Sequence, residues 1–104
     1  MDECIYEFYF DLSYFKVVGF YILDVITETP KTFRGNVLSH RGGKSFDRFI
    51  LQKDKLNRVS CGLYGGRRQL KTYVVSTSDD EALRQAKRLF AGFLSKVVSE
   101  LNEE

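Results

Sequence analysis

The chain has 104 residues, 43% of them hydrophobic and 29% charged, with a net charge of +2. This length fits one domain, and this hydrophobic share allows a core without disulfides or metal. Two cysteines are too few for a disulfide scaffold, and no apolar run approaches the roughly 20 residues that a membrane-spanning helix needs. We therefore expect a single α+β domain over residues 1–104, located in the cytoplasm and without membrane contact.

The first part of the chain has the alternating pattern of β-strands. Residues 5–12 place an aromatic or leucine side chain at every second position, and residues 15–28 form a longer β-rich run. The start of that run is apolar on both faces, which predicts a central strand covered on both sides. Gly19 predicts a bulge or bend within it, and Pro30 predicts a turn after it.

The middle of the chain contains shorter strand patterns separated by glycine turns. The predicted strands cover residues 32–39, 45–51, 58–64 and 69–76. Glycine pairs at 42–43 and 65–66 predict the turns of two hairpins. The polar residues 52–57 between these hairpins predict a loop or one helical turn.

An amphipathic helix is predicted at the C-terminal end. Ser78 followed by Glu81 forms a capping box, and apolar residues then recur at intervals of three and four as far as Leu101. The aromatic face of the sheet is the only surface that can cover this apolar stripe. The sequence thus predicts an α+β fold, with an antiparallel sheet of about five to six strands, built as a meander or hairpins, and one C-terminal helix packed on it.

Residue types that carry catalysis or metal binding form no recognised pattern. His40 is the only histidine, and its neighbour Ser39 offers no triad because adjacent residues usually point apart. Cys4 and Cys61 lack the spacing of a zinc site and are predicted to be reduced, buried hydrophobic residues. We expect a non-enzymatic protein with no cofactor and no metal.

Charge is distributed unevenly along the chain. Residues 1–30 hold six acids and one base, for −5, and residues 73–104 hold six acids and four bases, for −2. Residues 31–72 hold eleven bases and two acids, for +9. This basic middle favours an anionic partner, either nucleic acid or an acidic protein surface, although charges of this kind also fit a solvated sheet face.

Candidate contact residues for that partner flank the two glycine turns or lie on the strands beside them. They are Arg34, Arg41, Lys44, Arg48, Arg67 and Arg68. Aromatic residues are interleaved with these bases, among them Tyr64 and Tyr73, and exposed rings could stack on nucleotide bases.

The stretch FYILDVITETPKTFRGNVLS, followed by KDKLNRV, resembles small proteins encoded by phages and other mobile elements of bacteria. The resemblance implies a bacterial or phage cytoplasm and no particular residue roles. We predict a small binding module whose residues 31–72 engage an anionic partner such as nucleic acid. The alternative is a mobile-element inhibitor or adaptor that blocks a host protein through a sheet edge or an aromatic patch. The sequence leaves the oligomeric state open, a homodimer included.

Overall fold

The computed structural model describes residues 3–39 and 44–102 and confirms the predicted α+β fold. Its strands are β1 (Cys4–Asp11), β2 (Lys16–Glu28), β3 (Thr32–Ser39), β4 (Lys44–Gln52), β5 (Val59–Tyr64) and β6 (Arg67–Ser76). A short 3-10 helix, η1 (Lys53–Lys55), follows β4, and the helix α1 covers Asp79–Asn102. Each predicted strand is present, with small shifts at its ends, and the predicted helix follows them.

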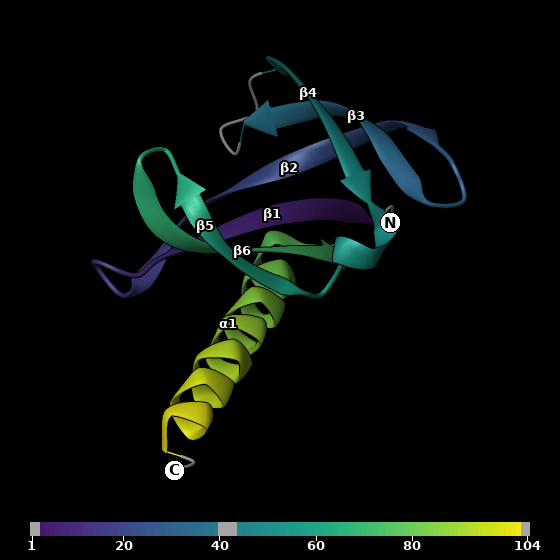
Figure 1. Ribbon diagram of the computed structural model, residues 1–104. Coiled ribbons are helices and arrows are strands. Elements are labelled where there is room, and N and C mark those ends of the chain that lie inside the picture. Colours follow the sequence, from purple (N-terminus) through teal and green to yellow (C-terminus); the bar gives the residue numbers. More distant parts are fainter. Residues whose placement is uncertain (1–2, 40–43, 103–104) are drawn as a thin grey trace.

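The six strands form one antiparallel sheet in the order β4-β3-β2-β1-β6-β5. Strands β1 to β4 form a meander, but β6 returns to pair with β1, so the chain crosses from one edge to the other between β4 and β5. The sheet is curled, and α1 lies below it in the view of Figure 1. Strand β1 is central because it has a hydrogen-bonded neighbour on each side, and most of its residues are buried.

Glycines lie at a bulge and at a hairpin turn of the sheet. The register between β1 and β2 skips one residue beside Gly19, which is the bulge predicted there. Gly65 and Gly66 have φ values of 60° and 78°, the left-handed values that a type I′ hairpin turn requires at both central positions.

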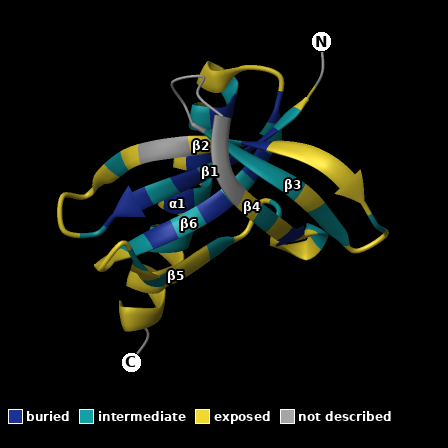
Figure 2. Ribbon diagram, turned by 90° about the horizontal axis from the view of Figure 1, so that it is seen from above, coloured by how far each residue is buried: buried dark blue, intermediate teal, exposed yellow. Residues whose placement is uncertain are grey.

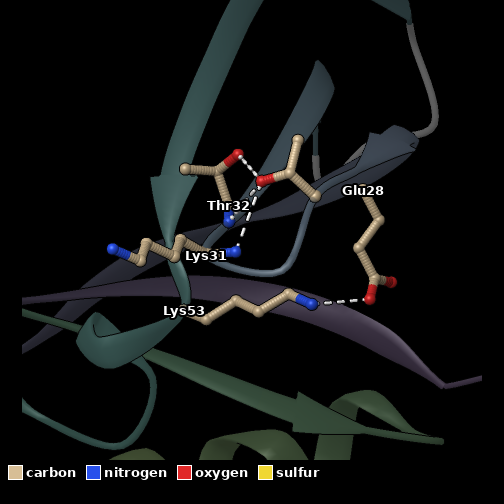
Figure 3. A network of polar contacts seen from close by, with 5 residues as sticks. Glu28, Lys31, Thr32 and Lys53 are labelled. Atoms are coloured by element: carbon tan, nitrogen blue, oxygen red, sulfur yellow. Dashed lines mark hydrogen bonds and ion pairs between the residues drawn. The ribbon is translucent and has the colours of Figure 1, made fainter.

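The turn after β2 is held by side chains and by η1 (Figure 3). The Thr29 hydroxyl oxygen accepts hydrogen bonds from the backbone N–H groups of Thr32, at 2.9 Å, and Lys31, at 3.3 Å. The backbone N–H of Lys53 in η1 donates to the Lys31 carbonyl at 2.8 Å. The side-chain Nζ of Lys53 lies 2.6 Å from the Glu28 carboxylate. Lys53, one of the basic residues of the segment 31–72, therefore has a structural role in holding this turn.

Apolar residues are buried on both faces of the sheet, and Figure 2 shows them along β1 and β6. The larger cluster lies between the sheet and α1 and includes Tyr6, Phe8, Phe10, Leu70, Val74, Ala82, Ala86 and Phe90. A smaller cluster on the opposite face is formed by Ile5, Leu23 and Leu51. Tyr73 and Val75 of β6 pack against the second cluster. Leu51 of the edge strand β4 thus shares a cluster with residues of β6, although three strands separate β4 from β6 in the sheet. The sheet must curl towards this side to bring them together, so the face opposite α1 is the concave one.

The prediction that the first part of β2 is covered on both faces is wrong at Val18 and Tyr21, and the side chains of residues 19 and 20 lie outside the described part. Leu23 is its only buried residue among those whose side chains the structure describes, and Val18, Tyr21 and Ile26 are exposed. The reason is the position of α1, which packs mainly on β6, β1 and β5; of β2, Val17 and Ile22 pack against the cluster beneath the helix and are only half-buried.

The prediction for the cysteines is wrong in part. Both are free thiols, but Cys4 is half-buried and Cys61 is exposed. Cys61 lies on β5, the strand at the edge of the sheet, where only a few residues touch the helix.

The apolar stripe of α1 is also covered only in part. Ala86 and Phe90 are buried and Phe93 is half-buried, whereas Val98 and Leu101 have exposed fractions of 56% and 73%. In Figure 1 the helix runs away from the sheet towards the C-terminal end of the chain. The sheet therefore does not cover residues 95–102, contrary to the prediction. No helix in the described part of the chain combines the length and apolar content needed to cross a bilayer.

Candidate functional site

Two of the predicted contact residues lie together on the β3–β4 hairpin. The register pairs Arg34 with Ile50 and Asn36 with Arg48, so the two arginines are diagonal neighbours on one face. Both are exposed, and they line a shallow hollow of about 460 Å³ that Ile50 also lines.

The other described pair, Arg67 and Arg68, begins β6. The Arg67 guanidinium lies 3.5 Å from the carboxylate of Asp11 and 5.1 Å from the centre of the Tyr14 ring. Asp11 is buried and also accepts hydrogen bonds from the backbone N–H groups of Tyr14 and Ser13, which hold the pKa of its carboxyl below the ordinary value. Arg67 thus supports the β1–β2 turn, while Arg68 is exposed.

The remaining predictions fall where the structure gives no side chain. Arg41, like His40, lies outside the described residues, and Lys44 begins β4 but its side chain lies outside the described part. Of the four candidate arginines whose side chains are described, Arg34 and Arg48 come from one half of the sheet and Arg67 and Arg68 from the opposite half. Strands β2 and β1 lie between these halves, so the structure does not bring the four together.

A different cluster lies on the concave face, built from four tyrosines on four strands. Tyr21 comes from β2, Tyr9 from β1, Tyr73 from β6 and Tyr64 from β5, and we call them the tyrosine face. The Tyr9 ring meets the rings of Tyr21 and Tyr64 edge to face, with centroids 6.2 Å and 5.5 Å apart. Such pairs fix the orientation of the rings.

Lys71 lies among these rings. The register places it beside Tyr9 on one side and Ser60 on the other, on the same face as Tyr73. Its Nζ lies 4.5 Å from the centre of the Tyr64 ring and 5.5 Å from that of Tyr73. No carboxylate of the described residues forms an ion pair with it. The Lys71 ammonium group therefore makes cation–π contacts with these rings and has no acidic partner among the described residues.

Glu7 lies on the same face as the rings, opposite Tyr21 on one side and Tyr73 on the other, and it acts as a hydrogen-bond acceptor. The Tyr9 hydroxyl donates to its carboxylate at 2.6 Å. Burial, followed by the interaction with Glu7, raises the pKa of both Tyr9 and Tyr73. These hydroxyls stay protonated at neutral pH, so they serve as hydrogen-bond donors and not as bases.

A pocket of about 510 Å³ opens beside Lys71, between the end of β4 and the β5–β6 hairpin. Its described lining residues are Ile50, Leu51, Gln52, Lys55, Ser60, Tyr64, Lys71 and Tyr73. The charged groups among them are the two lysines, and no acid is included. Cations, hydroxyl groups and flat rings around one opening suit an anionic ligand that has a planar apolar part.

Glycine at position 62 helps to shape this pocket. A Cβ atom at Gly62 would lie 3.0 Å from Cζ and from the hydroxyl oxygen of Tyr64, closer than an ordinary contact. The absence of a side chain there allows the Tyr64 ring to lie over its own strand, within reach of Lys71.

Sequence reasoning found this site only in part. Tyr64 and Tyr73 were among the interleaved aromatic residues, but Lys71 was not singled out. The spacing of Lys71 and Tyr73 shows that they share a face of one strand. Tyr9 and Tyr21 come from the acidic N-terminal segment, and only the pairing of β1 with β6 brings them to the site.

Residues 3–39 and 44–102 contain no group of three or more His, Cys, Asp or Glu side chains that could hold a metal ion. No protein-family model, curated protein or solved structure matches the chain, so the resemblance to phage-encoded proteins stays a prediction.

Proposed function

We propose that the protein is a small binding module that holds single-stranded nucleic acid on the tyrosine face, with one nucleotide in the pocket beside Lys71. The observation that carries this proposal is the position of Lys71, whose ammonium group lies between two tyrosine rings and forms no ion pair among the described residues. A phosphate of the nucleic acid provides the anionic partner that Lys71 does not have within the described chain, and a nucleobase stacks on the adjacent tyrosine ring.

The chemistry of the pocket favours a single strand over a duplex. The bases of a duplex are stacked on one another, whereas an unpaired base can turn its face to a tyrosine ring. Lys55 on the opposite wall offers a second cation for the backbone. Ser60 and Tyr64 add hydroxyl groups that can donate to phosphate or base oxygens.

The same geometry gives a role to two of the residues proposed from sequence. Ile50 lines both the pocket and the hollow between Arg34 and Arg48, so the two openings adjoin across the edge strand β4. A strand that leaves the pocket over β4 meets these two arginines next. Their contacts are to phosphates and carry no sequence preference.

The test is binding of a labelled single-stranded DNA oligonucleotide, followed by fluorescence anisotropy at low and at raised salt. Tyr64→Ala is expected to weaken binding by roughly 1–3 kcal/mol because a stacking surface is lost. Lys71→Gln is expected to lower the slope of log affinity against log salt concentration by about one, as the loss of one phosphate contact predicts. Lys96→Gln, an equal charge change on the exposed end of α1, is the matched control and should leave the affinity unchanged.

Two results would contradict this assignment. If Arg34→Gln and Arg48→Gln abolish binding while Lys71→Gln has no effect, the hollow on β3–β4 is the site and the tyrosine face is not. If the unmodified chain binds no oligonucleotide even at low salt, nucleic acid is the wrong partner. The alternative, an inhibitor or adaptor that binds a host protein through the edge of β4 or β5, then takes its place.

A further inference from the structure

We infer that α1 pairs in antiparallel orientation with α1 of a second copy of this chain, and that the exposed end of each helix lies in the groove between α1 and the β1–β2 hairpin of the other. This interaction surface is separate from the tyrosine face, which lies on the concave side of the sheet.

The groove has a volume of about 680 Å³, and it is mostly apolar. Its walls are the start of β2 with the preceding turn, and the first half of α1. The side chains that line it include Phe10, Phe15, Val17, Leu83, Phe90 and Leu94. Phe15 has an exposed fraction of 67%, and its ring meets Phe10 edge to face at 5.0 Å, so the hairpin presents an aromatic ring that the described chain covers only in part.

The apolar stripe on the helix continues beyond the groove. Leu83, Lys87, Phe90 and Leu94 line it at alternating intervals of four and three residues. Val97 and Leu101 continue this heptad spacing on the exposed end of α1. Every residue from 95 to 102 is exposed, so the last two turns of α1 have no packing partner within the described chain. Helices in proteins draw most of their stability from such packing.

Charge complementarity favours a second copy as the occupant. The charged residues among those that line the groove are Lys16 and Lys87, both basic. The exposed end of α1 carries Lys96 and Glu100; Glu100 lies next to Leu101 at the flank of the stripe, whereas Lys96 lies towards the opposite side of the helix. Lys87 and Leu101 lie one heptad to either side of Leu94. A two-fold axis near Leu94 therefore places Lys87 of one copy opposite Leu101 of the other and within one residue of the level of its neighbour Glu100, and the symmetry repeats this arrangement on the opposite side.

Small residues beside Leu94 allow the two helices to approach. Ala91 and Ser95 flank Leu94 on the helix surface, and both are exposed. The short side chains next to Leu94 thus leave room for a second helix near the proposed axis.

The test is sedimentation velocity of the full chain over a range of protein concentrations. We expect a monomer at low concentration and a dimer at high concentration. Leu101→Glu should abolish the dimer while the helical circular dichroism signal is retained, because the side chain is exposed in the single chain. Lys96→Glu, which changes a charge outside the stripe, is the matched control and should dimerise like the unmodified chain.

A charge exchange tests the antiparallel geometry itself. Lys87→Glu should weaken the dimer because the new carboxylate lies near Glu100 of the second copy, and the double variant with Glu100→Lys should restore it. A chain that stays monomeric at every concentration would overturn the inference, and a different partner would then have to cover the groove. A dimer that persists in Leu101→Glu, or one that the charge exchange fails to restore, would also overturn it. Oligonucleotide binding by the monomeric variants tests the tyrosine face separately.

Discussion

The two halves of α1 have the same amphipathic pattern but different surroundings. In the first half, Ala82, Ala86 and Phe90 are buried against the sheet, and the Tyr6 hydroxyl donates to Asp79 at 2.8 Å. In the second half, Val97, Val98 and Leu101 are exposed. A helix of 24 residues is about 36 Å long at 1.5 Å per residue, whereas three neighbouring strands span only about 10 Å from centre to centre. A helix of this length that crosses three strands is therefore too long to be covered by them, and its end extends beyond the sheet.

This comparison separates two properties that periodicity alone does not distinguish. An apolar stripe indicates that a helix face will be buried, but it does not say in what. The first half of α1 is buried by its own sheet. The second half is free to be buried by another molecule, which is the basis of the dimer proposed above.

The largest expected effect is in the first half of α1. Phe90→Ala should lower the free energy of unfolding by roughly 3–5 kcal/mol because it leaves a cavity between the helix and the aromatic face of β1. Chemical denaturation measures the change. A loss below about 1 kcal/mol would show that this half of the helix is not anchored as described.

The start of the helix should show a smaller effect. The Ser78 hydroxyl oxygen accepts a hydrogen bond from the backbone N–H of Glu81 at 3.2 Å, as expected of an N-cap. Ser78→Ala should cost about 1 kcal/mol, and Ser78→Asp should retain most of the stability because aspartate caps equally well. Equal losses in the two variants would indicate that the serine acts through something other than capping.

Alkaline pH tests the contact between Tyr6 and the helix. Burial, followed by the hydrogen bond to Asp79, raises the pKa of Tyr6 to about 12. The unfolded chain titrates near 10, so this contribution is complete below about pH 10 and is lost as the pH rises towards 12. Unfolding at a series of pH values should therefore show falling stability over that range, with a shallower fall in Tyr6→Phe. Tyr9 and Tyr73, whose pKa values are also raised, account for the remaining slope.

The smallest effect is expected at the exposed end of α1. At protein concentrations where the chain is monomeric, Leu101→Ser should change the free energy of unfolding by no more than about 0.5 kcal/mol. At concentrations where the dimer forms, the same variant should lose the additional stability that association provides. A large loss in the monomer would mean that Leu101 packs within its own chain, and the contrast between the two halves would fail.

Local features of the chain were readable from the sequence by itself. The strand patterns, the turn at Gly65-Gly66, the bulge at Gly19 and the cap at Ser78 each depend on a few neighbouring residues and their backbone preferences. These elements, and the basic middle of the chain, were predicted for that reason. The α+β class followed because an aromatic sheet face and an amphipathic helix can bury each other.

Long-range placement was decided only by the tertiary structure. The pairing of β6 with β1 joins residues far apart in the chain, and no local signal specifies which strands become neighbours. That pairing brings Tyr9 and Tyr21 to Lys71, and it separates Arg34 and Arg48 from Arg67 and Arg68. The direction in which α1 leaves the sheet was likewise not encoded in its stripe. Burial depends on which surfaces meet, and this is a property of the whole packed chain.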